Sequence, residues 1–427
     1  AAVGPLMAEI CDALDKPDTE DTQIEGDADT DSDADSDADS DADADSDSDA
    51  DTDIETDWDR FQDALDGSAD AEGTLLAISG SGGWPMEHDG AYVFAALDDG
   101  TTLQLAGDHN DWTPAAMTHQ GELWWTEVEV PTPQGSRYKF VHDGAYQADP
   151  WARAYNYDEN GELSHVRGPR PHLERWLQVG DGTIPPRTLR VWVPAQAVTH
   201  QLYVHDGQNL FDPAAIWGGW HLQDSLGSST MAIGIDNNGA ARFDEYTAWQ
   251  DDIGDGTIGG QGSDYSAYVL DTVRPLIEGR YGKAGKVGTM GSSLGGLIAL
   301  TTAMEQPDHW DYVASLSGTV GWGSLGLSND TVMERYVALG FFGVPVYLDS
   351  GGSGGSGCVD SDGDGIQDDS PNASDNYCEN RQMADALAEA GWTWDSTLWH
   401  WHESGAAHNE AAWAARVYRP VQIFEAL

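Results

Sequence analysis

A short apolar strand that breaks into a glycine-flanked serine and continues as an apolar helix constrains this chain more than any other feature. The strand is expected over Val287–Met290, and residues 291–295 read Gly-Ser-Ser-Leu-Gly. In such a strand-to-helix turn the central serine has a strained backbone, so the residues two positions away on both sides must be glycine. Only Ser293 meets this condition, because Ser292 has Met290 at that distance. The pattern predicts a nucleophile elbow at Ser293, and a Gly/Ser-rich helix start without chemistry is the alternative.

A serine hydroxyl needs a base to remove its proton, so the elbow predicts a histidine later in the chain, preceded by a carboxylate. His408 follows a strand-like segment, Thr397–Trp401, and a turn, and it opens the last helical pattern. His400 and His402 alternate within the strand pattern, where a histidine is more often a packing or edge residue. We therefore expect His408 to be the base.

Short β-branched runs alternate with helical patterns through the second half of the chain. Strands are expected over 188–193, 201–204, 230–235, 287–290, 312–316, 345–349 and 397–401, and helices over 265–281 and 381–390. This alternation predicts an α/β fold with a mostly parallel sheet covered on both faces. Catalytic groups are then expected at the carboxyl ends of the strands.

Several segments together resemble one known family. They are residues 202–212, 233–237, 242–247, the elbow and 405–410. From about Arg175 to Leu427 the chain resembles the putative esterase family, which groups enterochelin esterases, feruloyl and acetyl-xylan esterases, S-formylglutathione hydrolase and mycobacterial mycolyltransferases. The resemblance implies the α/β-hydrolase fold and an ester-cleaving activity.

An oxyanion hole needs two backbone N–H groups, one from the residue after the nucleophile and one from the loop after an earlier strand. Leu294 supplies the first. By similarity to the family, the second is expected at Gly207 or Gln208, and an ordinary turn at these residues is compatible with that role.

The acid of the predicted triad has two candidates. Asp349 ends the strand over 345–349, whereas the family usually places its carboxylate several residues later, just before the next helix. Here an insertion, residues 351–378, separates the two places, and Asp375 lies at its far end. We favour Asp375, and Asp349 stays open as the alternative.

The insertion contains alternating carboxylates that are typical of an all-oxygen calcium loop, in which a glycine permits the sharp turn. The loop resembles thrombospondin type 3 repeats and lacks the glutamate of an EF-hand. A structural calcium ion is therefore expected, with no cofactor for catalysis, and a solvated acidic loop is the alternative. The expected ligands are Asp360, Asp362, Asp364, Ile366 through its carbonyl, and Asp368.

Cys358 and Cys378 bracket this loop in a chain with three cysteines, and we expect them to form a disulfide. Cys11 is left over. A disulfide indicates an oxidising compartment, so we expect a secreted, periplasmic or surface-attached protein, although the first residues lack the features of a signal peptide.

The N-terminal third divides into two parts. From Asp27 to Asp53 every odd-numbered residue is aspartate, which predicts a disordered, extended linker. Four short strand patterns then predict a β-sandwich resembling the early-set module that also precedes the hydrolase in enterochelin esterases. The expected organisation is residues 1–73 with the linker, 74–170 as the β-sandwich, and 171–427 as the hydrolase. The strand patterns lie at 91–94, 103–106, 122–128 and 138–141.

The net charge of −56 is distributed over the whole chain, since the repeat aspartates account for only a quarter of it. Such acidity argues against nucleic acid as a partner and fits a protein from a halophilic or marine source, where salt screens the repulsion. No run of eighteen apolar residues exists, so no membrane-spanning segment is expected.

These observations predict a serine carboxylic ester hydrolase that works through an acyl-enzyme, with Ser293, Asp375 and His408 as the triad. The substrate is expected to be a siderophore lactone or a feruloyl or acetyl ester on polysaccharide. Trp217 and Trp220 are candidate walls for a flat acyl group, and equally candidates for the core. An acyltransferase, or a binding protein on a hydrolase fold, are the other possibilities.

Overall fold

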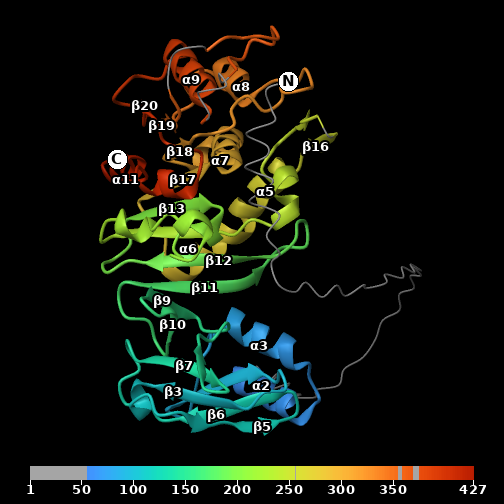
Figure 1. Ribbon diagram of the computed structural model, residues 1–427, viewed down its shortest axis with the longest axis vertical. Coiled ribbons are helices and arrows are strands. Elements are labelled where there is room, and N and C mark those ends of the chain that lie inside the picture. Colours follow the sequence, from blue (N-terminus) through green and yellow to red (C-terminus); the bar gives the residue numbers. More distant parts are fainter. Residues whose placement is uncertain (1–54, 255, 354–357, 369–374) are drawn as a thin grey trace, which may run out of the picture.

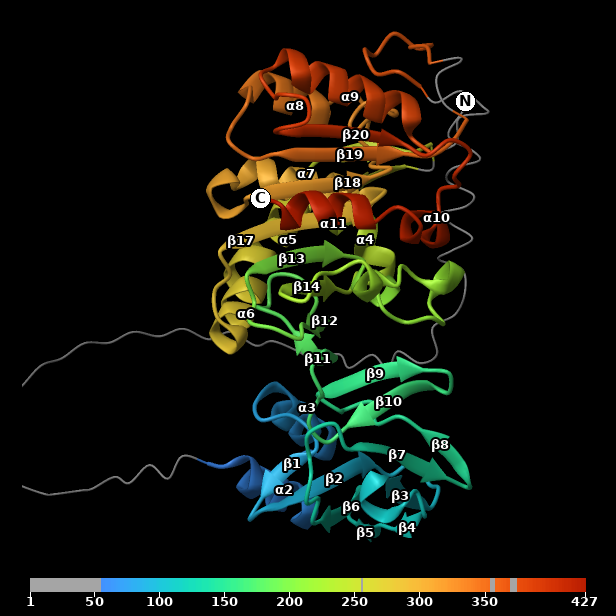
Figure 2. The ribbon, with the colours of Figure 1, turned by 90° about the vertical axis from the view of Figure 1, so that its left-hand side faces the viewer.

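The computed structural model describes residues 55–254, 256–353, 358–368 and 375–427. The repeat over 27–53, the linker predicted for it and Cys11 lie outside these residues. In Figures 1 and 2 the strands follow one another along the long axis, from β20 near one end to the N-terminal β region at the other.

Six parallel strands form the centre of the hydrolase part. They lie next to one another in the order β20, β19, β18, β17, β13, β14, and each predicted strand of this region is present. β12 (Arg187–Val193) adds antiparallel to β14. The bounds of the six are Leu398–His402, Val346–Ser350, Tyr312–Leu316, Lys286–Ser292, His200–His205 and Thr230–Ile235.

Both faces of this sheet are buried, because successive side chains of each strand point to opposite faces. In β13, Tyr203 joins a core with α5, α6 and α7, while Leu202 and Val204 join a second core under α11. The helices are α5 (Gly262–Tyr268), a π-helical turn (Val269–Val273), α6 (Arg274–Tyr281), α7 (Leu294–Glu305), α8 (Val332–Leu339), α9 (Tyr377–Glu389), α10 (Glu410–Ala414) and α11 (Tyr418–Glu425).

This arrangement is an α/β-hydrolase fold, as predicted. Among the described residues, none of the helices combines the length and the apolar character that crossing a bilayer requires.

The N-terminal β region contains two facing sheets. In β2 (Ala91–Leu97), Tyr92 and Phe94 pack toward Leu105 and Phe140 of the opposite sheet. One sheet consists of β1 (Met86–His88), β2, β6 (Leu123–Val128) and β5 (Thr118–Gln120). The facing strands are β3 (Leu103–Gly107), β4 (Ala115–Ala116), β7 (Arg137–His142), β8 (Ala145–Gln147), β9 (Ala154–Asp158) and β10 (Gly161–His165).

Two helices that the sequence reading did not predict cover the other face of the first sheet. α2 (Asp57–Asp66) and α3 (Ala71–Gly80) bury Phe61, Leu75 and Ile78 against Val93 of β2. The region is therefore not purely β, and the boundary expected between residues 73 and 74 falls inside α3. The resemblance to an early-set module stays a prediction.

The β region and the hydrolase part share one sheet. β11 (His172–Val179) pairs with β12 on one side and with β9 on the other, through the Cα partners Leu173 and Tyr155. The boundary expected between residues 170 and 171 therefore lies between two strands of a continuous sheet, which Figure 2 shows as β9, β11 and β12 in succession.

Candidate active site

Ser293 lies in the predicted turn between β17 and α7. Its backbone has φ 55 and ψ −125, a region that non-glycine residues rarely occupy. A Cβ at Gly291 would overlap the backbone of Gly295, which explains the glycine there. Leu294 is the first residue of α7, so its N–H has no partner within the helix.

The loop after β13 lies against this turn. A Cβ at Gly295 would come within 2.9 Å of the Asp206 Oδ2 atom. Gly207 and Gln208 belong to the single 3-10 turn that follows, Gly207–Asn209. The structure thus brings the two predicted sources of oxyanion donors to the same edge of the sheet.

Arg242 holds the start of this loop in place. Its Nε and Nη2 atoms donate to the two carboxylate oxygens of Asp206, each over 2.8 Å, and Asn237 donates to Oδ1 over 2.7 Å. Burial alone would raise the pKa of Asp206, but the adjacent guanidinium keeps it below its ordinary value. Glu245, three residues after Arg242, has a different partner and accepts two hydrogen bonds from Arg187.

His408 and Asp375 form a hydrogen-bonded pair. His408 lies between β20 and α10, and its Nδ1 is 2.7 Å from Oδ1 of Asp375, which precedes α9. Both side chains are buried, with 4% and 0% of their surface exposed. Nε2 of His408 has no hydrogen-bond partner among the described residues. That nitrogen is therefore available to take a proton.

The alternatives that the sequence left open occupy other environments. Asp349 receives hydrogen bonds from Arg416 Nε and Tyr347 Oη, each over 3.1 Å, and burial raises its pKa to about 6. His400 is largely buried within β20, and desolvation lowers its pKa to about 4. His402 contacts the carbonyl of Gly352 over 3.2 Å. The pair with His408 is thus made by Asp375.

Sequence reading missed the groups that hold the second oxygen of Asp375. Oδ2 accepts from Ser317 Oγ over 2.7 Å, from Arg416 Nη2 over 3.1 Å and from the Gly351 N–H. Trp413 also donates to Ser317 Oγ, over 3.1 Å, and its ring meets that of His408 edge-on. The position of Arg416 directly after the apolar run 411–415 was the available signal, since a buried arginine requires carboxylate partners.

The two tryptophans proposed as pocket walls differ from each other. Trp217 is 64% exposed, in a short turn (Ile216–Gly218) that lies beside α10. Trp220 is 2% exposed and packs against Trp413 in the core, so it cannot form an open wall. The buried indole of Trp220 supports α10 through its contact with Trp413.

The disulfide predicted between Cys358 and Cys378 is present, with Cα atoms 5.4 Å apart. Within the loop it closes, carboxylate oxygens of Asp360, Asp362 and Asp364 lie within 4.8 Å of one another. Of the other two predicted ligands, Asp368 accepts a hydrogen bond from the Ser361 N–H over 2.9 Å. The side chain of Ile366, whose carbonyl is the expected ligand, is buried in the core. The calcium site stays a prediction.

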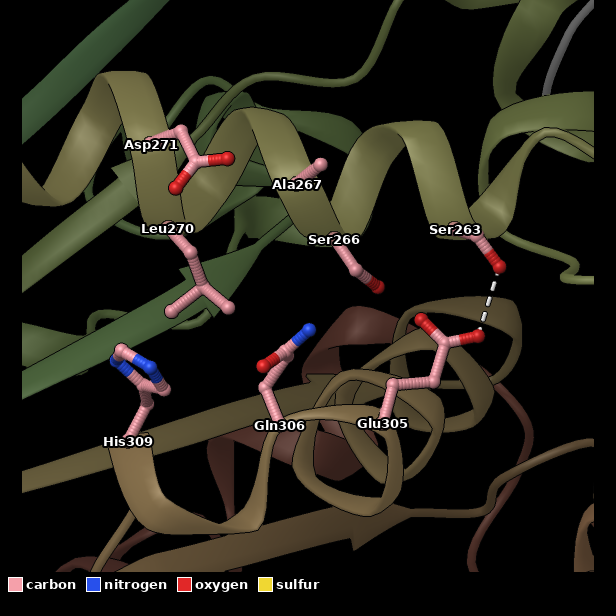
Figure 3. Close-up of a pocket in the computed structure, with 8 residues that line it drawn as sticks. All are labelled: Ser263, Ser266, Ala267, Leu270, Asp271, Glu305, Gln306 and His309. Carbon is pink, nitrogen blue, oxygen red and sulfur yellow. Dashed lines mark hydrogen bonds between the residues drawn. The ribbon is translucent and has the colours of Figure 1, made fainter.

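A hollow of about 340 Å³ lies elsewhere, between α5 and the end of α7 (Figure 3). Ser263 and Glu305 face each other across it and share a hydrogen bond of 2.7 Å. None of its lining residues is a predicted site residue. They are Ser263, Ser266, Ala267, Leu270, Asp271, Glu305, Gln306 and His309.

A strained serine at the start of a helix and a buried His–Asp pair, placed at the carboxyl ends of parallel strands, are features of the α/β-hydrolase class of enzymes. The family follows from a direct match: residues 186–421 match the family described as putative esterase. The chain therefore belongs to the putative esterase family, as the sequence predicted.

Individual relatives are distant. The uncharacterized protein YbbA of Bacillus subtilis is 30% identical over 126 residues, which make up 28% of this chain and 49% of that protein. The chain thus spans about half the length of this curated relative. Membership of the family rests on the match over residues 186–421.

Three solved structures are similar at low identity. The ferric enterobactin esterase of Salmonella typhimurium is 14% identical, with a TM-score of 0.43 over 79% of this chain and 94% of that one. The IroE-like serine hydrolase of Shewanella oneidensis is 16% identical, with a TM-score of 0.45 over 60% and 80%. The siderophore hydrolase EstA of Aspergillus nidulans is 16% identical, with a TM-score of 0.43 over 60% and 95%.

Proposed function

We propose that the protein is a serine carboxylesterase that works through an acyl-enzyme. The observation that carries the proposal is the 2.7 Å pair between His408 and Asp375, whose histidine keeps Nε2 free of other partners. A neutral imidazole held in this tautomer by a carboxylate is suited to accept the proton of a serine hydroxyl. Ser293, in its elbow at the same edge of the sheet, is the nucleophile of this proposal.

The reaction proceeds in two balanced halves. Ser293 Oγ attacks the ester carbonyl carbon while His408 Nε2 takes its proton, and the tetrahedral intermediate expels the alcohol, which receives that proton. A water then loses a proton to His408 and attacks the acyl-enzyme, and collapse returns the proton to Ser293 and releases the carboxylic acid. The N–H groups of Leu294 and of Gly207 or Gln208 stabilise the negative oxygen in both halves.

The surroundings of the site favour a neutral ester over an anionic ferric siderophore. Arg242 and Arg416, the arginines described beside the site, are already bonded to Asp206 and to Asp349 and Asp375, respectively. Trp217, exposed beside α10, offers a flat apolar surface for an aromatic acyl group. We therefore rank a feruloyl or acetyl ester on polysaccharide first and a siderophore lactone second.

The test compares the wild type with Ser293→Ala on p-nitrophenyl acetate, methyl ferulate and a catecholate trilactone. Loss of all hydrolysis in Ser293→Ala is expected, and the best of the three substrates indicates the acyl class. Ser292→Ala is the matched control, because it removes the neighbouring hydroxyl and should keep the activity. Hydrolysis that survives in Ser293→Ala would contradict the proposal.

Two alternative functions would give distinct results in the same assay. An acyltransferase would give more ester of an added sugar alcohol than free acid. A binding protein on a hydrolase fold would leave all three substrates intact.

We further propose that the protein works in an oxidising compartment, as a secreted, periplasmic or surface-attached enzyme. The disulfide between Cys358 and Cys378 supports this location, since such bonds are rare in a reducing cytosol. Localisation of the tagged full-length protein by cell fractionation tests it, and recovery in the cytosol with free thiols would refute it.

A further inference from the structure

A buried arginine connects the His–Asp pair to a second carboxylate. Arg416 lies between α10 and α11, and its side chain is 1% exposed. Nε donates to Oδ1 of Asp349 over 3.1 Å, and Nη2 donates to Oδ2 of Asp375 over 3.1 Å and to Ser317 Oγ over 2.6 Å. Nη1 reaches the Ala412 carbonyl over 3.3 Å. Each nitrogen of the guanidinium therefore has a fixed partner.

This arrangement decides which oxygen of Asp375 faces the histidine. Arg416, Ser317 and the Gly351 N–H all bind Oδ2, so Oδ1 is the oxygen left for His408. The carboxylate of Asp375 cannot rotate about its Cβ–Cγ bond without breaking the hydrogen bonds to Oδ2. The imidazole is in turn packed against Trp413, three residues before the arginine.

Charge explains why a second carboxylate is present. One guanidinium and two carboxylates are buried together, which leaves one negative charge when His408 is neutral and none when it becomes imidazolium. The charged or titratable groups facing Asp349 are Arg416, Asp375, Tyr347 of β19 and Tyr312 of β18. Without Asp349, Asp375 would be the one carboxylate bonded to Arg416, and the guanidinium would no longer be held from both sides.

We propose that Arg416, held by Asp349, is a positioning residue that keeps Oδ1 of Asp375 directed at His408. This inference rests on the proposed function, because it assigns Arg416 a part in activating Ser293. It goes beyond the triad, since the side chains of Arg416 and Asp349 are buried away from any bound substrate.

The decisive variant is the double replacement Asp349→Leu/Arg416→Met. It removes one positive and one negative buried charge together, so no charge is left unpaired by the change, and such replacements are often tolerated by the fold. Two readouts are followed: kcat and KM on the ester, and the rate at which a fluorophosphonate labels Ser293. Labelling reports serine activation even if the chosen ester is a poor substrate.

A positioning role predicts a kcat and a labelling rate lowered on the order of a hundredfold, with KM near that of the wild type. The downfield proton resonance of His408 Nδ1 should shift or broaden in the same variant. Arg416→Lys keeps the charge with fewer donors, and should recover part of the loss. A double variant that is folded and within twofold of the wild type in both rates would overturn the proposal.

The control is Arg175→Met/Glu162→Leu, which removes another shielded ion pair, between β11 and β10. It should leave kcat unchanged, and an equal loss of kcat there would show that lost stability alone explains the effect. If the first double variant does not fold, Ser317→Ala and Arg416→Lys decide, because unchanged rates in both would equally overturn the proposal. Ser293→Ala, measured alongside, shows separately whether the proposed function itself fails.

Discussion

Gly207 has no room for a side chain. An added Cβ would lie 2.6 Å from the carbonyl carbon of Gly234 and 2.7 Å from the nitrogen of Ile235, both rigid backbone atoms of β14. Gly207→Ala should therefore displace the loop that carries the proposed oxyanion donor and lower kcat on the order of a hundredfold. Steady-state kinetics on p-nitrophenyl acetate measure this.

The matched control is Gly279→Ala in α6, where an added Cβ meets nothing within 4 Å. Alanine is the better helix former by about 1 kcal/mol, so this variant should be slightly more stable and equally active. A Gly207→Ala enzyme as active as Gly279→Ala would mean that the loop does not supply the donor.

Asp149 makes the stability of the β region depend on pH. Burial raises its pKa to about 6, although Tyr138 Oη donates to it over 2.6 Å and the Trp151 N–H over 2.8 Å. The folded pKa lies above the unfolded value, so the proton stabilises the fold fully below the unfolded pKa, and this contribution is lost as the pH rises through about 6.

Asp149→Asn cannot titrate, so its free energy of unfolding should fall less than that of the wild type between about pH 4 and pH 7. The difference between the two losses of free energy amounts to at most about 3 kcal/mol over this range. Urea denaturation at several pH values measures it. Parallel curves for the two proteins would show that Asp149 stays ionised in the fold.

At the residue scale, sequence alone predicts those catalytic groups that require particular neighbours or a particular place between elements. The prediction of Ser293 rests on its two flanking glycines, and that of His408 on its place after the last strand. The carboxylate was harder, because the choice between Asp349 and Asp375 depends on how the insertion folds back. Ser317 and Arg416 were missed because their contacts with Asp375 form only when distant segments meet. For Trp220 the sequence left a pocket wall and the core as equal alternatives, because the pattern of a loop does not show whether an indole is buried.

The insertion between β19 and α9 is an element closed by its disulfide, with 20 residues of sequence separation. Replacing both cysteines, Cys358→Ser/Cys378→Ser, should lower the free energy of unfolding by about 3 kcal/mol, because the unfolded chain gains freedom. Activity at low temperature should persist, since Asp375 keeps its bonds to Ser317 and Arg416. Thermal melts and kinetics under the same conditions measure the two effects.

Cys11→Ser leaves the disulfide intact and is the matched control for the cysteine replacement. A double variant that melts like Cys11→Ser would show that the bond adds no stability. Activity lost at low temperature would instead show that Asp375 depends on the insertion for its position.

Among the elements, alternation of strands and helices predicted the hydrolase sheet, and each expected strand is present. The helices α2 and α3 were not predicted from the sequence, since each helix has only 10 residues and directly follows or neighbours a strongly acidic segment. Local signals were nevertheless available. Thr56 and Asp59 form a capping box at the start of α2, and Phe61 and Leu65 lie four residues apart on one helical face.

For the whole molecule, the net charge of −56 predicts a stability that depends on salt. Repulsion among so many carboxylates opposes folding and weakens when the Debye length falls to about 3 Å near 1 M salt. The Tm should therefore rise by several degrees from dilute buffer to about 1 M KCl. Calorimetry across a KCl series measures this.

Most of that rise should be complete by about 1 M, because screening then reaches atomic distances. A Tm that is unchanged, or lower, in molar salt would contradict the prediction of a protein adapted to salt. A rise that continues steeply at higher concentrations would point to ion exclusion from apolar surface instead of screened repulsion.

The pairing of β9 with β11 affects whether the hydrolase part can be produced without the β region. Sequence patterns place a module boundary near residue 170, yet the hydrogen-bonded sheet continues through it. A shortened chain starting there would expose the edge of β11 that pairs with β9. The unpaired N–H and C=O groups of an exposed strand edge can pair with strands of other molecules. The hydrolase part on its own is therefore expected to self-associate. In the full chain, pairing with β9 covers this edge of β11 and protects it from aggregation.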